Sequence, residues 1–548
     1  MTFLKRNMNH LWVSFVFSIT LFLINPLSVY SQNLDNDTFL FKEISSWLML
    51  FSIISGILLS IFVIIFSKRL KYLPLLLTAL LFCIWIQGNF INYSLGKLDG
   101  HEIIWHETFK KIWFEILIWL IIFAITIIFR KILLRNNNLI LVLILLLNTT
   151  PTIFTLIKNN ETKPDVSYLQ TSGEFEFSET NVIIIILDAF ESTTFQHILE
   201  KYPEYQATFK DFIYFSDAIG GYTTTKPSIP FILTGEYYKN LEPINDYISS
   251  VENKSIPYQL KKHGYRIESY PYVPVFSSIY DNQTNSMSSK NRLSQATQQT
   301  IISGIRYSPL VLKPYFIARY YHGFDYFHKD LITFNTRVNE VVISTNKPMF
   351  KLFHFSGAHV PFQLDGKLNW NNAGYLEQAA SSLVPVKNLL TELLVAGVYD
   401  KSLILIMGDH GVFGKQGYST FPLSNIAQPL LLAKKSDQVF KEMQVSESPV
   451  TLGDTSKTIA NETGIDVIYP GFSFFDKIPE SRKRIYYFYT WEQVNWSTTY
   501  LPTLYEFEVN GLARLTSSWT LTGKYADGQR VDEISYGDID FVNLLLGK

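Results

Sequence analysis

The chain has 548 residues, and 47% of them are hydrophobic, which is high for a soluble protein. Its formal net charge is -1 at pH 7, so nothing in the charge balance indicates a nucleic-acid-binding or general polyanion-binding surface. The single cysteine, Cys83, lies in an apolar run, which excludes a disulfide or a zinc–thiolate site elsewhere in the chain.

The excess of apolar side chains is concentrated in the first part of the chain. Five apolar stretches are long enough to be predicted as membrane spans, at about residues 11–24, 44–66, 73–91, 112–129 and 139–157. The first follows Lys5 and Arg6 and is either a cleaved signal peptide or a retained helix. We favour the helix because the apolar stretch continues through Pro26 and Leu27.

Basic residues cluster in the short loops on one side of these stretches, at Lys5–Arg6, at 68–71 and at 130–135. The loops on the other side are richer in acidic residues, with a few lysines mixed in. The positive-inside rule then places the N-terminus in the cytoplasm and the chain after residue 157 outside. We therefore expect a multi-pass protein of the cell (inner) membrane with its larger part on the extracytoplasmic side.

The rest of the chain is predicted to hold a linker at 158–180, an α/β domain at 181–480 and a small β-rich subdomain at 481–548. Apolar runs at 181–187, 349–353, 402–407 and 428–433 are typical of buried strands, and the stretches 195–201, 228–233 and 375–395 are expected to be helical. Together with an all-α membrane bundle at 1–157, this pattern predicts a mainly parallel sheet.

Metal-binding side chains follow two of these strands. Asp188 comes directly after the strand 181–187, and Asp409-His410-Gly411 follows the strand 402–407. The carboxyl ends of parallel strands meet at one edge of a sheet, so these carboxylates and the imidazole can bind one cation there. Zn, Mn, Mg and Ca all use such ligands. The alternatives are a helix N-cap for Asp188 and a surface turn for Asp409 and His410.

A second group of polar residues lies in the loop Tyr222–Gly235, with the sequence YTTTKPSIPFILTG. Its threonines precede a predicted helix, where free N–H groups and the helix dipole favour an anion or an ionised hydroxyl. A Ser/Thr-rich N-cap is the alternative. His354 and His359 follow the strand 349–353, and a hydrogen-bonded core histidine is the alternative for His354.

These motifs resemble those of a known superfamily. Thr225-Lys-Pro-Ser228 with Leu233-Thr-Gly235 resembles the sulfatase signature Cys/Ser-x-Pro-Ser…Leu-Thr-Gly, and Thr225-x-x-Ser228-Ile-Pro230 resembles a motif of phosphoethanolamine transferases. From about residue 181 to 475 the chain is similar to the alkaline phosphatase/sulfatase superfamily. The similarity is greatest to its membrane-anchored phosphoethanolamine- and phosphoglycerol-transferase branch, which includes lipoteichoic-acid-synthase-like members.

The resemblance implies an alkaline-phosphatase-like (sulfatase-like) α/β domain and specific roles for its residues. Thr225 would be the nucleophile, and the implied metal ligands are Asp188, Thr225, Asp409 and His410. His359 falls where the family binds the substrate phosphate or a second zinc, and it could also protonate the leaving oxygen. His354, His359 and Lys226 are the candidate substrate-binding residues, with Lys415 an alternative lysine.

Three departures from the family pattern refine these expectations. No histidine follows His410, and Val412 replaces the usual acidic residue, so we expect one firmly bound divalent metal of open identity. The chain also has no cysteine to convert into the formylglycine of true sulfatases. Thr223 and Thr224 are rival nucleophiles, and only the motif spacing selects Thr225.

The function implied is metal-dependent transfer of a phosphoryl head group, phosphoethanolamine or phosphoglycerol, through a phosphothreonine intermediate. The donor would be a membrane phospholipid and the acceptor an envelope glycan or glycolipid, both reached from the lipid bilayer; no nucleic acid is expected as a partner. One alternative is a phosphodiesterase or sulfatase-like hydrolase of the same superfamily. The other is a non-catalytic membrane regulator that binds lipid.

Overall fold

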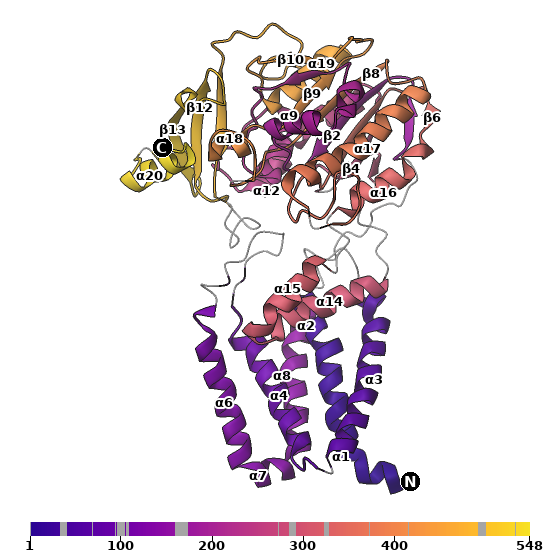
Figure 1. Ribbon diagram of the computed structural model, residues 1–548, viewed down its shortest axis with the longest axis vertical. Helices are drawn as coiled ribbons and strands as arrows, with labels where there is room; N and C mark the ends of the chain where they lie inside the picture. Colours follow the sequence, from indigo (N-terminus) through magenta and orange to yellow (C-terminus); the bar gives the residue numbers. More distant parts are fainter. Residues whose placement is uncertain are drawn as a thin grey trace. The chain divides into compact units, whose positions relative to one another are not determined.

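The computed structural model shows a chain of two compact units, one of residues 1–167 with 288–324 and one of residues 168–287 with 325–548 (Figure 1). It describes residues 2–32, 41–67, 69–93, 95, 105, 109–158, 174–271, 273, 275–283, 292–322, 328–371, 373–414, 416–490, 500–531 and 533–548.

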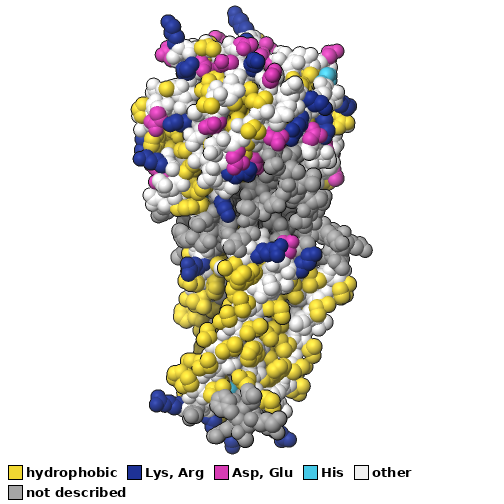
Figure 2. Space-filling model, turned by 90° about the vertical axis from the view of Figure 1, so that its right-hand side faces the viewer, with side chains coloured by type: hydrophobic (Ala, Val, Ile, Leu, Met, Phe, Trp, Pro, Cys, Tyr) yellow, Lys and Arg dark blue, Asp and Glu magenta, His cyan; other side chains and the backbone are white. Residues whose placement is uncertain are grey.

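The first unit is helical. Its chain-order helices are α1 (Thr2–Ile19), η1 (Thr20–Ile24), α2 (Asn25–Ser31), α3 (Phe41–Phe66), α4 (Leu73–Phe90), α6 (Ile112–Ile128), α7 (Arg130–Arg135) and α8 (Asn137–Lys158). Among the described residues, four helical segments are long and apolar enough to cross a membrane: Met8–Ser31, Phe41–Phe66, Leu73–Phe90 and Asn137–Ile157. They indicate a multi-pass membrane protein, and hydrophobic side chains cover much of the face of this unit that Figure 2 shows.

The fifth predicted span corresponds to a shorter helix. α6 has 17 residues, or about 25 Å at about 1.5 Å per residue, against about 30 Å of bilayer hydrocarbon. Phe129 leaves the α-helical conformation, and the chain continues in the basic helix α7. The side of the membrane on which each loop lies stays a prediction.

A helical hairpin from the middle of the predicted α/β segment belongs to this first unit. It consists of α14 (Arg292–Tyr307), η4 (Leu310–Leu312) and α15 (Lys313–His322). The buried face of α14 carries the polar residues Gln295, Gln299 and Ser303 beside Ala296, Ile305 and Tyr307, so it lacks the continuous apolar stripe by which sequence patterns reveal helix packing. This polar face explains why the sequence did not predict the excursion.

The second unit is built on a mixed sheet of eight strands. In spatial order these are β10 (Gln444–Ser446), β3 (Ile213–Phe215), β9 (Leu431–Lys434), β8 (Ser402–Met407), β2 (Asn181–Leu187), β7 (Met349–Phe355), β4 (Arg266–Pro271) and β5 (Asn282–Gln283). Every pairing is parallel except those of β9 with β3 and β8, which confirms the predicted mainly parallel sheet.

The central strand β2 is buried along its whole length because helices cover both faces of the sheet. On one face, Ile183 and Ile185 join a core with α9 (Ser192–Lys201), α16 (Lys329–Arg337) and α17 (Tyr375–Val395). On the other face, Ile184 and Ile186 join a core with α11 (Thr225–Thr234), α12 (Ile244–Val251), α13 (Ile256–Lys262) and α19 (Thr455–Thr463).

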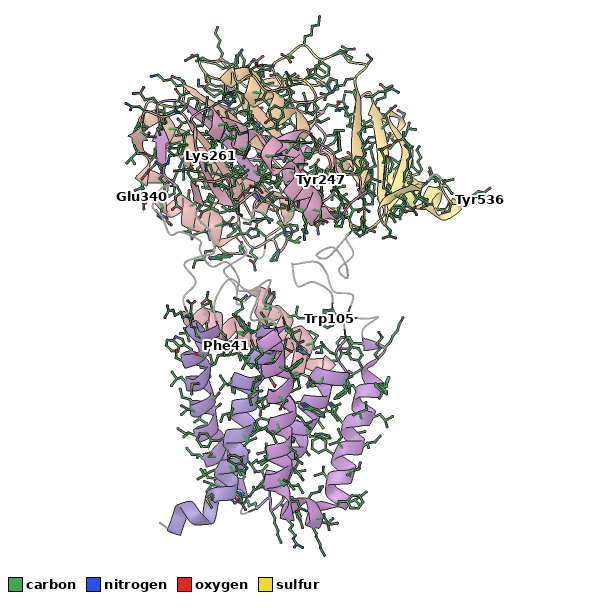
Figure 3. The ribbon with its side chains drawn as sticks, turned by 180° about the vertical axis from the view of Figure 1, so that it is seen from behind. Phe41, Trp105, Tyr247, Lys261, Glu340 and Tyr536 are labelled. Atoms are coloured by element: carbon green, nitrogen blue, oxygen red, sulfur yellow. The ribbon has the colours of Figure 1, made fainter. Side chains whose placement is uncertain are left out.

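The C-terminal segment, which was predicted to be β-rich, forms a separate antiparallel sheet. Its strands are β11 (Lys483–Phe488), β12 (Leu504–Asn510), β13 (Trp519–Ala526) and β14 (Gln529–Val531), followed by α20 (Tyr536–Leu545). Figure 3 labels Tyr536 at the start of α20. Near the other end of this unit, β1 (Glu176–Ser178) pairs with β6 (Val342–Thr345), so the end of the predicted linker is structured. Residues 159–173 of that linker lie outside the described residues.

A buried ion pair joins the C-terminal sheet to the central sheet. Arg484 of β11 donates to Asp217, which follows β3, at 2.7 Å, and both side chains are fully buried. We predict that Asp217→Ala lowers the free energy of unfolding by about 3–5 kcal/mol, because the Arg484 charge stays buried without a counter-charge, with only backbone carbonyl oxygens to accept from it. Urea unfolding of the detergent-solubilised full-length protein measures this change.

The matched control is Arg514→Ala, which removes the exposed pair between Arg514 and Glu447. Solvent screens that pair, so its loss should cost about 1 kcal/mol or less. Equal effects of the two substitutions would contradict the structural role of the Asp217–Arg484 pair.

Candidate functional site

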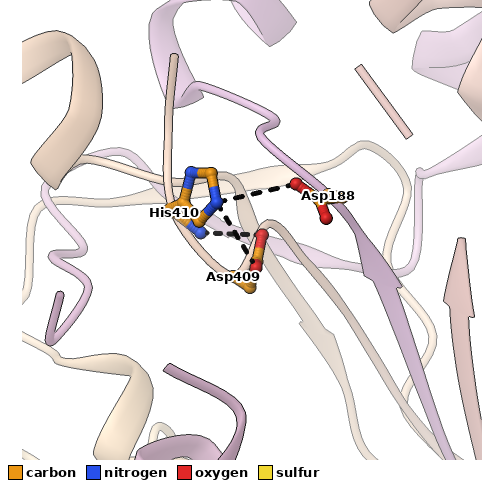
Figure 4. Close-up of side chains that lie close together, drawn as sticks. All are labelled: Asp188, Asp409 and His410. Atoms are coloured by element: carbon orange, nitrogen blue, oxygen red, sulfur yellow. Dashed lines mark hydrogen bonds and ion pairs between the residues drawn. The ribbon is translucent and has the colours of Figure 1, made fainter. Parts of the chain in front are cut away.

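Three predicted metal ligands meet at the carboxyl end of the central strands. β2 leads into Asp188, and β8 leads through Gly408 into Asp409 and His410. One ligand atom from each of the three lies within 4.8 Å of the others, and all three residues are buried. His410 Nε2 is 3.6 Å from Asp188 Oδ1 and 3.6 Å from Asp409 Oδ2 (Figure 4).

Close backbone packing fixes the loop around Asp188. The Asp188 amide donates to Phe355 O at 3.1 Å, and Ala358 N donates to Asp188 O at 2.8 Å. Gly357 has φ +52°, and a Cβ there would lie 2.4 Å from Asp188 N. A glycine is therefore required where the loop after β7 meets the loop after β2.

Gly411 is required for a related reason. Its φ is not in the left-handed region, but a Cβ would lie 1.9 Å from Asn425 O. Close approach of the backbone, rather than an unusual backbone conformation, makes this glycine necessary. Gly414 does have a positive φ, of +73°.

Two buried carboxylate oxygens and one imidazole nitrogen are arranged so that they could bind a cation. In the part of the chain that the structure describes, neither Asp188 Oδ1 nor Asp409 Oδ2 has a hydrogen-bond partner, although both are buried. Buried carboxylate oxygens almost always have partners. These two oxygens and His410 Nε2 face one another, and two oxygens with one imidazole nitrogen suit a divalent metal.

The electrostatics of the three residues are strongly perturbed. Burial and the neighbouring Asp188 charge raise the pKa of Asp409. Burial would also raise the pKa of Asp188, but the neighbouring imidazoles of His354, His359 and His410 hold it below its usual range. Burial opposes charge on His410, yet the Asp409 and Asp188 carboxylates raise its pKa. The site therefore favours added positive charge.

Thr225 lies against this group. It is the first residue of α11, and its Oγ1 donates to Asp188 Oδ2 at 3.2 Å. The N-cap position belongs to Thr224, whose side chain does not cap the helix but hydrogen-bonds to the Tyr489 hydroxyl. Thr223 Oγ1 donates to Tyr489 O at 3.1 Å. Of the three threonines, Thr225 is thus the one whose hydroxyl contacts the acidic group.

The remaining predicted residues lie around this centre. His354, which is buried in β7, has Nε2 3.8 Å from Asp188 Oδ2, and Val273 N donates to its Nδ1 at 3.4 Å. His359 has Nδ1 2.5 Å from Val360 O, and its charge acts on Asp188. Lys226 follows Thr225 in α11, and partial burial lowers its pKa. Lys415 lies outside the described residues.

Sequence reasoning missed two groups that support the site. Ser356 donates to Asp330 Oδ1 at 2.7 Å, and its Oγ is 2.9 Å from His328 Nδ1, which secures the loop that leads from β7 to His359. Tyr489, just after β11, holds the threonines that precede Thr225. These residues come from distant parts of the chain, so no local pattern could reveal them.

We predict that Asp409→Asn abolishes tight metal binding. The Asn carbonyl oxygen can still accept from Ala189 N, as Asp409 Oδ1 does at 3.2 Å, but an amide nitrogen replaces the second ligand oxygen. Metal retained after desalting, measured by elemental mass spectrometry, should fall by more than about tenfold. Asp400→Asn, at an exposed position before β8, is the matched control and should retain metal. Full retention by Asp409→Asn would show that Asp409 is not a ligand.

Comparisons with known proteins assign the family. Residues 180–465 match the model of the Sulfatase family. A comparison with curated proteins yields no match. Among solved structures, a protein of the alkaline phosphatase superfamily from Vibrio parahaemolyticus is 11% identical, with 68% of this chain and 86% of that chain covered and a TM-score of 0.40. The phosphonate monoester hydrolase of Silicibacter pomeroyi is 14% identical, with 67% and 93% covered and a TM-score of 0.39.

A third structure, of a protein in complex with its substrate D-glucosamine-2-N,6-O-disulfate, is 12% identical, with 60% and 87% covered and a TM-score of 0.41. The buried group of Asp188, Asp409 and His410 lies within the matched residues and is consistent with a metal site. Because the family model covers more than half of the 548 residues, the chain belongs to the Sulfatase family.

Proposed function

We propose that this protein transfers a phosphoryl head group, phosphoethanolamine or phosphoglycerol, from a membrane phospholipid to an envelope glycan or glycolipid. The observation that carries the proposal is the contact of the Thr225 hydroxyl with Asp188, at the N-terminus of α11 and beside Asp409 and His410. The family acts on sulfate and phosphate esters, and the chain has no cysteine at the nucleophile position. The apolar N-terminal helices favour a lipid donor.

Thr225 is the proposed nucleophile. Its position as the first residue of α11 exposes it to the positive end of the helix dipole, which stabilises a developing oxyanion. A divalent metal held by Asp188, Asp409 and His410 would lower the pKa of the Thr225 hydroxyl and offset charge on the phosphoryl group. Thr225 would be a further ligand when its hydroxyl ionises.

The reaction proceeds in two displacements. Thr225 Oγ attacks the phosphorus, the bond from phosphorus to the glycerol oxygen breaks, and diacylglycerol leaves with a proton that His359 donates. The head group is then a phosphodiester of Thr225. An acceptor hydroxyl gives its proton to His359 and attacks the same phosphorus, which releases Thr225 and the head group on the acceptor. Lys226 and His354 contribute positive charge or hydrogen bonds near the phosphoryl oxygens.

We predict that Thr225→Ala lowers the release of diacylglycerol from phosphatidylethanolamine or phosphatidylglycerol vesicles by a factor of about 10³ or more. The loss follows because the covalent step has no nucleophile. The assay uses acyl-labelled lipid, metal-loaded protein, and envelope membranes as the source of acceptor. Thr224→Val is the control, since this rival hydroxyl contacts Tyr489 and should change the rate only modestly.

The same assay separates the alternatives. Release that is equal with and without acceptor, with free head-group phosphate as product, would indicate a hydrolase. Release that persists in Thr225→Ala would contradict Thr225 as the nucleophile. If metal-loaded wild-type protein releases diacylglycerol from neither lipid, the proposed donor is contradicted. If the protein binds no metal and releases no diacylglycerol, a regulatory role is favoured.

A further inference from the structure

The α14–η4–α15 segment, residues 292–322, forms a hairpin on the helical unit, and we name it the interfacial hairpin. α14 packs against α2, α3 and α4, and η4 packs against α6. Tyr307 lies so close to Gly88 of α4 that a Cβ at Gly88 would be 2.1 Å from its ring. The hairpin is therefore a fixed part of the helical unit.

Buried polar contacts hold the hairpin in place. Gln299 Nε2 donates to Pro26 O at 3.0 Å, Arg306 Nε donates to Gly88 O at 3.0 Å, and the Tyr307 hydroxyl is 3.1 Å from Ser28 Oγ. All three acceptors lie on α2 or α4, which belong to segments long and apolar enough to cross a membrane. The hairpin thus lies against the ends of the apolar helices.

A pair of buried charges fixes the turn of the hairpin. Glu115, in the first turn of α6, accepts from Leu310 N at 2.8 Å and from Gln87 Nε2 at 3.0 Å. Lys313 is also fully buried and donates to the carbonyl oxygens of Ile305 and Arg306 at the end of α14. Burial of both charges costs desolvation free energy, which these hydrogen bonds offset only while the turn keeps this position.

This arrangement leaves an apolar tip exposed. Val311, Leu312 and Tyr315 are 61%, 48% and 60% exposed. They follow Leu310, which contacts Glu115, and the two residues directly before Glu115, Trp113 and Phe114, are 75% and 61% exposed. The exposed apolar surface of α6, a helix of the membrane bundle, is therefore next to the apolar tip.

The surroundings of the tip have the composition of a membrane interface. Trp105 stacks on Phe109 just before α6, and Trp105 and Phe41 are labelled at the same end of the helical unit in Figure 3. Lys110, Lys111 and Arg319 are exposed nearby in the chain, at the start of α6 and on α15. Aromatic rings favour the interface, and basic side chains pair with lipid phosphates.

We propose that the interfacial hairpin binds the phospholipid interface at this end of the helical unit, with Val311, Leu312 and Tyr315 inserted among the upper acyl chains. An exposed apolar tip that adjoins lipid-facing helix surface, and that is flanked by basic side chains, fits this one occupant. The hairpin is also joined to the second unit by two chain connections, so that unit is attached to the membrane by more than the 158–180 segment. The inference does not depend on the reaction at the site.

Fluorescence quenching in vesicles tests the proposal. Because Cys83 is the single cysteine, Cys83→Ser gives a cysteine-free background for a labelled Leu312→Cys variant. In phosphatidylethanolamine/phosphatidylglycerol vesicles, we expect blue-shifted emission from an environment-sensitive label at Leu312. Nitroxide placed near the head groups should quench it more than nitroxide near the chain ends.

Two labelled controls calibrate depth. Ile121→Cys, exposed on α6, should be quenched more by the deep nitroxide, and Thr336→Cys, exposed on α16, by neither. A Leu312 label that behaves like the Thr336 label, with emission typical of water and no quenching, would overturn the proposal.

Substitution of Glu115 tests what fixes the hairpin. Glu115→Ala removes the acceptor for Leu310 N and leaves Lys313 buried without its counter-charge, so the difference between shallow and deep quenching at Leu312 should be lost. Glu115→Gln keeps one acceptor oxygen and should retain most of that difference. If the difference between shallow and deep quenching is unchanged in Glu115→Ala, then Glu115 does not fix the hairpin at its depth in the membrane.

Discussion

The structure of the site depends on two carboxylates that are buried side by side. β2 and β8 are adjacent, and their register pairs Ile186 with Met407, so Asp188 and Asp409 emerge at the same edge of the sheet. Two like charges in a region of low dielectric repel each other by several kcal/mol unless positive charge lies between or beside them. His410 supplies part of that charge, and a divalent cation would supply the rest.

The need for positive charge beside these two carboxylates also explains the position of Thr225. α11 begins where its N-terminus faces Asp188, so the helix dipole, the buried histidine and a bound cation would all act on one hydroxyl. Tyr489 holds the preceding threonines away from the acidic group. The C-terminal sheet therefore contributes to the site although it carries none of the predicted ligands. Its attachment through Asp217 and Arg484 links the stability of that sheet to the geometry around Thr225.

Local patterns were sufficient to predict the elements that build the site, but not the contacts between distant segments. The strands 181–187 and 402–407 and the helix 375–395 have the predicted bounds because each is a continuous apolar run or a long amphipathic pattern with clear ends. The helix at Thr225 begins three residues before the prediction, because Pro227 is compatible with a first helical turn. Tyr489, Asp330 and the polar face of α14 act only through tertiary contacts, so their roles could not be predicted.

The central claim is that Thr225 forms a covalent bond to a phosphoryl head group, and peptide mapping by mass spectrometry after incubation with phosphatidylethanolamine or phosphatidylglycerol tests it most directly. The account predicts a head-group phosphate on Thr225, in the peptide that spans Tyr222 to Lys226, and its loss when a chelator is added first. A metal-loaded protein that turns over lipid while the adduct forms on another residue, such as Thr223 or Thr224, would contradict the claim.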